Sequence, residues 1–154
     1  MASGISSFLS PCEVLLDIRA ASKVSLLHEL SERSADLTGL SPEYIFAELS
    51  KRENLGSTGM GDGVAIPHAT YAGLKEPFGI AARIKPAIDF ESIDSKPVDL
   101  VFLLLTPALS EKTHLNALAA VSRKLRNGDV TARLRAAVDR ETFYGALTAG
   151  AHCV

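Results

Sequence analysis

The sequence predicts an α/β fold, a single-domain sandwich in which helices flank a mixed β-sheet. The 154 residues suffice for one domain spanning residues 1–154, with its core at about residues 14–149. The run Leu100–Leu105 is apolar at every position, which is typical of a central strand covered on both faces. Segments with helical periodicity lie before and after this strand, so the chain alternates between helices and strands.

The first half of the chain is expected to form one strand and two helices. The strand is predicted at Glu13–Ile18. Leucines at helical spacing predict a helix over Lys23–Leu37, which Ser22 could cap. A Ser-Pro pair at residues 41–42 predicts the start of a second helix, because serine is favoured at the cap and proline in the first turn. We expect that helix to end near Asn54.

The second half is expected to contribute three more strands and three helices. The strands are predicted at Val64–Ile66, Gly79–Ile84 and Val98–Leu105. The helices are predicted at Ser110–Arg126, Asp129–Val138 and Glu141–Ala149. We expect Pro107 to end the last strand, and Asn127-Gly128 to end the long helix through a glycine cap.

Composition and charge exclude several classes of function. The formal net charge is −2 and basic residues are scattered, so neither nucleic acid nor an anionic membrane surface is an expected partner. No apolar run approaches the roughly 18 residues that span a bilayer. The first cation is Arg19, which is unlike the basic start of a signal peptide. We therefore expect a cytoplasmic protein in which Cys12 and Cys153 are free thiols.

The segment GSTGMGDGVAIPHA, residues 56–69, concentrates glycine ahead of a proline and a histidine. It lacks the lysine of a phosphate-binding P-loop and has Asp62 in its place. A helix is predicted before it and a proline follows, which excludes a dinucleotide-binding loop. A nucleophile elbow is excluded by the order of its residues. Its exposed N–H groups could instead form an anion site. The candidate phosphate-binding residues are Ser57, Gly59, Gly61 and Gly63.

His68 is the candidate catalytic residue of this segment. Pro67 fixes its own φ and restricts the residue before it, so His68 is held on a stiff base. A neutral imidazole can take up a phosphoryl group as an N–P bond and pass it on. A purely structural histidine after a proline fits the same spacing.

Three other side chains are candidate companions of His68. Arg52, near the end of its helix, could hold phosphate oxygens, or simply complement the helix dipole. His114, early in the long helix, could donate to phosphate or orient His68, or be a boundary histidine. Thr113, like Ser57, could contact phosphate or serve only as a cap. His68 and His114 alone are too few ligands to predict a metal site, and no cofactor is expected.

Three segments are long and specific: LGSTGMGDGVAIPHA, IDFESIDSKPVDLVFLLLTP and KTHLNALAAVSRKLR. In this order they resemble the IIA proteins of the bacterial phosphotransferase system. The type is the fructose–mannitol one, and GSTG is most similar to its nitrogen-related branch. The resemblance implies the fold of that family, with a mixed sheet flanked by helices. It also implies phosphorylation of His68 on Nε2, binding of the phosphoryl group by Arg52, and support from His114.

The resemblance further implies partners and a role. The phosphoryl donor would be a phosphohistidine carrier of the HPr kind, with no metal or nucleotide bound to this protein. We expect a nitrogen-type regulator, whereas a sugar-relay subunit that donates to a IIB domain is the alternative. An interaction module without chemistry and a metal-binding protein are further alternatives. Asp62 and Thr70 depart from the family pattern and could change the choice of partner.

Overall fold

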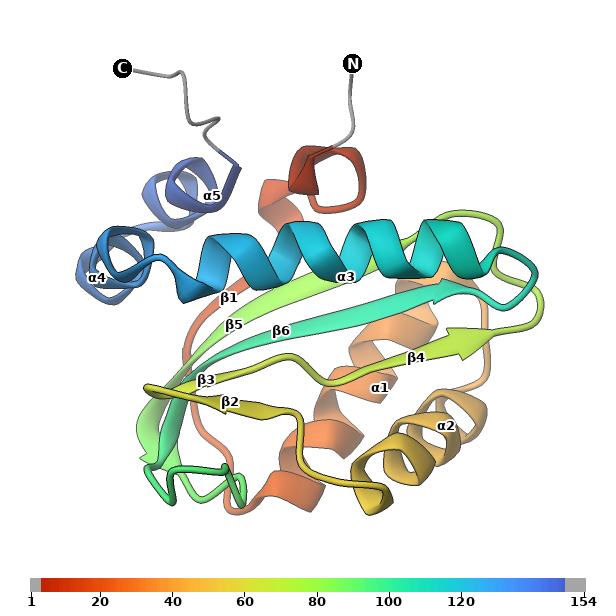
Figure 1. The fold of residues 1–154 in the computed structure, drawn as a ribbon, viewed down its shortest axis with the longest axis horizontal. Coiled ribbons are helices and arrows are strands. Elements are labelled where there is room, and N and C mark those ends of the chain that lie inside the picture. Colours follow the sequence, from red (N-terminus) through yellow and green to blue (C-terminus); the bar gives the residue numbers. More distant parts are fainter. Residues whose placement is uncertain (1–3, 149–154) are drawn as a thin grey trace.

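The computed structural model describes residues 4–148, which form one six-stranded mixed sheet between two layers of helices (Figure 1). The strands are β1 (Val14–Ile18), β2 (Gly59–Gly61), β3 (Val64–Ala65), β4 (His68–Tyr71), β5 (Phe78–Ile88) and β6 (Val98–Pro107). The α-helices are α1 (Lys23–Thr38), α2 (Pro42–Asn54), α3 (Glu111–Arg126), α4 (Gly128–Ala136) and α5 (Arg140–Thr148). Two 3-10 turns, Ile5–Ser7 and Pro11–Glu13, precede β1. The predicted α/β class is confirmed.

β6 is the organising strand of the sheet. The strand order is β1-β5-β6-β3-β2, and β4 also pairs with β6. β5 runs antiparallel to β6, whereas β3 and β4 run parallel to it. β3 and β4 lie one after the other along the same edge of β6. The segment that contains β3 and β4 therefore runs alongside β6 (Figure 1).

The two faces of β6 belong to two separate hydrophobic cores. Leu100, Phe102 and Leu104 lie in the core covered by α3, α4 and α5. Val101, Leu103 and Leu105 lie in the core covered by α1 and α2. The alternation follows from the two-residue period of a strand. It confirms the expectation of a central strand that is apolar on both faces.

The predicted helix starts are confirmed by their caps. The Ser22 hydroxyl accepts a hydrogen bond from the backbone N–H of Ser25 at the start of α1. The Ser41 hydroxyl accepts from Tyr44 N–H at 3.0 Å, with proline in the first turn of α2. Such caps satisfy N–H groups that have no partner inside the helix.

Several predicted boundaries are wrong. β5 continues to Ile88, and β6 extends two residues beyond Leu105, although it ends at Pro107 as expected. Proline is tolerated there because the pairing of β5 with β6 already ends at Phe78↔Leu105, so no carbonyl of β5 faces the missing N–H. β2 and β4 were not predicted, because the segment that contains them has little intrinsic strand propensity; β2 gains its pairing from β3, and β4 gains its pairing from β6.

The predicted glycine cap at residues 127–128 is also wrong. Asn127 is extended, with φ −81° and ψ 115°, and Gly128 is already the first residue of α4. The Asn127 side chain accepts from Asp129 N–H at 2.9 Å and so caps the next helix. The predicted end of the last helix at Ala149, and Cys153, lie outside the described residues. Cys12 is exposed and carries a free thiol. Within residues 4–148 no helix has the length and apolar character needed to cross a membrane.

Candidate active site

His68 and His114 face each other at the carboxyl end of β6. Their ring centroids lie 5.7 Å apart, with the ring planes tilted by 40°. His68 is the first residue of β4 and pairs with Leu104. His114 lies in the first turns of α3, which follows β6 after a short connection. Both side chains are half-buried. The sheet register therefore brings together the two histidines that the sequence singled out.

The His68 ring is oriented by a backbone carbonyl. Its Nδ1 lies 2.7 Å from the carbonyl oxygen of Ile66. A carbonyl can only accept, so in the neutral ring Nδ1 carries the proton and Nε2 keeps its lone pair. Burial lowers the pKa of His68 from its ordinary value of 6.5, the hydrogen bond to Ile66 raises it by less, and the positive charge of Arg52 lowers it further. His68 is therefore neutral at pH 7, with a nucleophilic Nε2.

His114 is held from the opposite side. Its Nδ1 lies 2.6 Å from the hydroxyl oxygen of Thr106, and burial lowers its pKa, so it too is neutral at pH 7. Ser110 caps α3 by accepting from Thr113 N–H, and the Ser110 hydroxyl donates to the Thr113 hydroxyl at 2.7 Å. Thr113 thus takes part in the cap, as one of its two interpretations predicts.

Arg52 lies near the end of α2, close enough for its charge to lower the pKa of His68. Its Nη1 donates to the carbonyl oxygen of Gly56 at 2.9 Å. A guanidinium has five N–H donors, so this single bond leaves most of them for a ligand. The bond also keeps the cation beside the segment that leads to His68, rather than extended into solvent.

Glu53, which the sequence did not single out, links the end of α2 to Thr58, the residue before β2. Its side chain is only 5% exposed and lies 2.9 Å from Lys23 Nζ. It also accepts from Thr58 N–H at 3.1 Å and from the Thr58 hydroxyl. The charge of Glu53 raises the pKa of His68, opposing the larger effect of burial. The only signal in the sequence was an acid beside Arg52, which gives no hint of burial.

The four predicted loop residues occupy different places. The Ser57 hydroxyl donates to Phe90 carbonyl oxygen at 2.8 Å and accepts from Gly59 N–H at 3.0 Å. Gly61 and Gly63 form the turn between β2 and β3, with φ of +100° and +82°. Val64, next to that turn, pairs with Leu100, which is four residues before the partner of His68. At about 3.3 Å per residue the turn therefore lies about 13 Å along β6 from the histidine pair.

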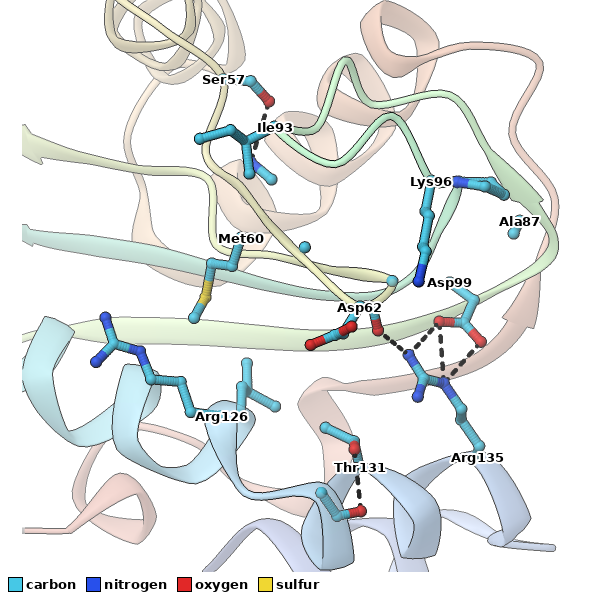
Figure 2. A pocket seen from close by; sticks show the side chains of 16 residues that line it. Ser57, Met60, Asp62, Ala87, Ile93, Lys96, Asp99, Arg126, Thr131 and Arg135 are labelled. Carbon is cyan, nitrogen blue, oxygen red and sulfur yellow. Dashed lines mark hydrogen bonds and ion pairs between the residues drawn. The ribbon is translucent and has the colours of Figure 1, made fainter.

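The turn borders a cleft of about 970 Å³ (Figure 2). Arg135 crosses it to form a two-pronged ion pair with Asp99, with distances of 3.0 and 2.9 Å, and donates to the carbonyl oxygen of Asp62 at 2.7 Å. Asp62 and Lys96 also line this cleft, whereas His68 and His114 do not. Thr70 is exposed on β4, two residues beyond His68. Asp62 and Thr70, the two departures from the family pattern, therefore lie in different parts of the structure.

The site contains a neutral nucleophilic nitrogen, a second imidazole and a guanidinium within a half-buried neighbourhood. Phosphoryl groups are bound by such N–H donors, because negative charge is spread over their oxygens. Among residues 4–148 no group of three or more histidine, cysteine or acidic side chains is placed to hold a metal ion.

Comparison with known proteins agrees with this chemistry. The model of the family "Phosphoenolpyruvate-dependent sugar phosphotransferase system, EIIA 2" matches residues 7–149. The chain belongs to this family. The predicted resemblance to IIA proteins of the phosphotransferase system is thereby confirmed.

Individual members of the EIIA 2 family are similar over most of the chain. A nitrogen regulatory protein of Bradyrhizobium diazoefficiens is 43% identical over 143 residues, which is 93% of this chain and 94% of that protein. The crystal structure of the nitrogen regulatory protein IIA-Ntr from Neisseria meningitidis has a TM-score of 0.89 at 34% identity, and the match covers 94% of this chain and 99% of that one. A fructose-specific EIIA component of Haloferax volcanii is 38% identical over 99 residues, 64% of each chain. The likeness to the nitrogen-related branch is confirmed.

Proposed function

We propose that this EIIA 2 protein is a cytoplasmic phosphocarrier that accepts a phosphoryl group on Nε2 of His68. The donor would be the phosphohistidine of an HPr-like carrier protein. The observation that carries the proposal is the hydrogen bond between Nδ1 of His68 and Ile66 carbonyl oxygen, because it directs the free lone pair to Nε2. The lowered pKa of His68 supports the proposal, since a protonated ring has no lone pair to attack with.

The step exchanges one P–N bond for another. Nε2 of His68 attacks phosphorus in line with the leaving imidazole of the carrier, whose P–N bond breaks and whose nitrogen takes back the electron pair. Nδ1 of His68 keeps its proton, and the carbonyl of Ile66 stabilises the positive charge that the ring acquires. Arg52 and His114 would hold the phosphoryl oxygens as charge redistributes. No proton needs to leave the site.

The role we favour is nitrogen-type regulation. The relatives from Bradyrhizobium diazoefficiens and Neisseria meningitidis are both described as nitrogen regulatory proteins, and their coverage is nearly complete. A phosphoryl group adds about −1.5 to −2 charges, which is enough to make or break a protein contact. The similarity to a fructose-specific EIIA component supports the second candidate, a sugar-relay subunit that donates to a IIB domain.

The decisive experiment is incubation with phosphoenolpyruvate, enzyme I and an HPr-like carrier, followed by intact mass measurement and site mapping. We expect one acid-labile phosphate on His68, and none in His68→Ala. His28→Ala is the matched control, because His28 is exposed and stacked on Phe46, and we expect it to be phosphorylated normally. Full phosphorylation of His68→Ala would refute the assignment of the nucleophile. No mass gain with an active cognate carrier would favour a non-catalytic interaction module.

A second arm separates the two roles. Purified fructose-type and mannitol-type IIB domains are added to the phosphorylated protein, and the label is followed. We expect it to remain on this chain. Rapid transfer to a IIB domain would establish the sugar-relay subunit instead.

A further inference from the structure

Thr106 is a buried polar residue that the proposed mechanism has not used. It is the penultimate residue of β6, and its exposed fraction is 0%. Its hydroxyl oxygen lies 2.6 Å from Nδ1 of His114. A buried hydroxyl in contact with one active-site ring can decide which ring nitrogen carries the proton, because a neutral histidine has one donor and one acceptor nitrogen.

The direction of this hydrogen bond follows from the alternatives open to the hydroxyl proton. It can point to Nδ1 of His114 at 2.6 Å, or to the carbonyl oxygen of Ala69 at 3.5 Å. The longer distance lies beyond the usual range of a hydroxyl hydrogen bond, whereas the shorter one is typical of a strong bond. If Nδ1 were the donor instead, the Thr106 proton would be left with only the weak acceptor.

The carbonyl of Ala69 also belongs to the backbone ladder between β4 and β6. On either side of it, Leu104 N–H donates to Pro67 carbonyl oxygen at 2.9 Å, and Ala108 N–H donates to Tyr71 carbonyl oxygen at 3.1 Å. This alternating register assigns the Ala69 carbonyl to the ladder as well. It has less need of a second donor than the ring nitrogen, which has no other hydrogen-bond partner within residues 4–148.

We propose that Thr106 is a positioning residue whose hydroxyl donates to Nδ1 of His114 and so holds the His114 proton on Nε2. The proposal rests on the proposed phosphoryl transfer to His68 for its functional meaning. The two facing rings then have opposite tautomers. His68 has its proton on Nδ1, bonded to the Ile66 carbonyl, and presents a lone pair at Nε2. His114 presents an N–H donor at Nε2.

Opposite tautomers suit a site where one ring attacks phosphorus and the other binds its oxygens. An N–H group stabilises the charge of a phosphoryl oxygen, whereas a lone pair in the same place would repel it. Without the Thr106 hydroxyl, the two tautomers of His114 would interconvert. A fraction of the molecules would then present the repulsive form.

The test compares Thr106→Val, which keeps the branched shape without the hydroxyl, with Thr106→Ser, which keeps the hydroxyl. Long-range ¹H–¹⁵N NMR spectra of the imidazoles at pH 8 identify the protonated nitrogen of each neutral ring. In the wild type and in Thr106→Ser we expect His114 as the Nε2–H tautomer and His68 as the Nδ1–H tautomer. In Thr106→Val we expect His114 to become a mixture while His68 is unchanged.

Phosphoryl transfer from the carrier supplies a second readout. We expect its rate to fall about tenfold or more in Thr106→Val and to stay within about threefold in Thr106→Ser, as the loss of one buried hydrogen bond to a catalytic ring implies. A general loss of structure in Thr106→Val would move the His68 resonances as well, which the proposal does not expect.

Two outcomes would overturn the proposal. One is a wild-type His114 that carries its proton on Nδ1. The other is a Thr106→Val protein whose His114 tautomer is unchanged. Neither requires phosphorylation, so the tautomer assignment can fail while transfer to His68 succeeds. Conversely, the absence of phosphate on wild-type His68 would refute the proposed function and leave the tautomer result intact.

Discussion

The polar side chains at the two ends of β6 differ in whether their donors and acceptors are bonded within the protein. At the amino end Asp99 is neutralised by a two-pronged pair with Arg135, which also binds the turn carbonyl of Asp62. At the carboxyl end His68 and His114 each have Nδ1 held by one partner. Within residues 4–148 no hydrogen bond holds either Nε2. The first arrangement satisfies its groups internally, whereas the second leaves donors and a lone pair for a ligand.

The cleft and the reactive side chains lie at opposite ends of β6. The cleft of about 970 Å³ lies at the amino end, beside the ion pair (Figure 2). The proposed nucleophile His68, the second imidazole and the neighbouring guanidinium lie at the other end, where we propose that another protein carries in the reacting group. A site that receives a phosphoryl group from a protein partner must present its nucleophile at an accessible surface, so a deep cavity is not required.

Removing Arg52 should have the largest effect on this comparison. We expect Arg52→Ala to lower kcat/KM for phosphoryl transfer by about 10²–10³, which is the usual cost of losing one preorganised donor to a transition state. Arg52→Lys should recover only part of the rate, because an ammonium group lacks the two-pronged geometry of a guanidinium. The measurement is the rate of phosphate transfer from a labelled HPr-like carrier.

Arg126→Ala is the matched control, since Arg126 is an exposed cation that lines the cleft at the amino end. We expect its transfer rate to stay within about twofold of the wild type, as for a surface cation that does not touch the reacting group. If the transfer rate fell more in Arg126→Ala than in Arg52→Ala, the reacting phosphate or the docking carrier would lie at the amino end of β6, which contradicts our interpretation.

The amino end should instead be sensitive in stability. Gly63 has φ +82°, and a Cβ added there would lie 2.5 Å from Nη2 of Arg135 and 2.9 Å from Oδ1 of Asp99. We expect Gly63→Ala to lower the free energy of unfolding by about 2 kcal/mol, through backbone strain and displacement of the ion pair. Chemical denaturation measures the change, and phosphoryl transfer by the folded protein should be unaffected.

Gly128→Ala provides the control for Gly63→Ala. Gly128 begins α4, and an added Cβ would meet nothing within 4 Å. We expect a change within about 0.5 kcal/mol, or a slight gain in stability, because alanine restricts the unfolded chain. Equal effects of the two substitutions would contradict the view that the turn is closely packed against Arg135.

Sequence periodicity and caps were sufficient for the helices and the central strand. Ser22 and Ser41 cap as predicted, and Leu100–Leu105 is buried on both faces. These features depend on neighbours within a few residues. β4 could not be predicted, because its pairing is supplied by β6, a strand that is distant in the chain. β2 pairs with its neighbour β3, but its three residues contain two glycines and so carry no strand signal of their own. The glycine cap predicted at the end of α3 was wrong because the Asn127 side chain caps the following helix, α4, and not α3.

The candidate site was predictable in its residue types and only partly in its geometry. His68, His114 and Arg52 were chosen for their chemistry, and the register of β4 on β6 brings the two histidines face to face. The sequence predicts the same phosphate-binding role for all of the loop glycines. In the structure, Gly61 and Gly63 instead form a turn at the amino end of β6, away from the two histidines. Glycine spacing indicates backbone freedom, but it does not say in which direction the chain runs afterwards. Thr106 had no signal in the sequence, because a threonine in an apolar strand is ordinary.

The smallest expected effect is a dependence of stability on pH that comes from the carboxyl end of β6. Burial lowers the pKa of both His68 and His114 from 6.5, so below about pH 6.5 the unfolded chain binds protons that the native chain resists. The free energy of unfolding should therefore decrease as pH falls below 6.5. The decrease should stop once the pH is below the lowered native pKa values of both rings. A double variant with His68→Gln and His114→Gln should lose part of this slope.

Carboxyl groups act in a separate pH window. Asp94 has its pKa lowered from 3.8 by accepting from the backbone N–H of Asp62, so its contribution is present above about pH 4 and is lost as pH falls further. Urea denaturation between pH 8 and pH 5 thus isolates the histidines. An unchanged slope in the double variant would mean that both rings titrate in the native protein as they do in the unfolded chain. Burial at the carboxyl end of β6 would then not be what disfavours the charged rings, which is the part of the contrast with the ion-paired amino end that this experiment tests.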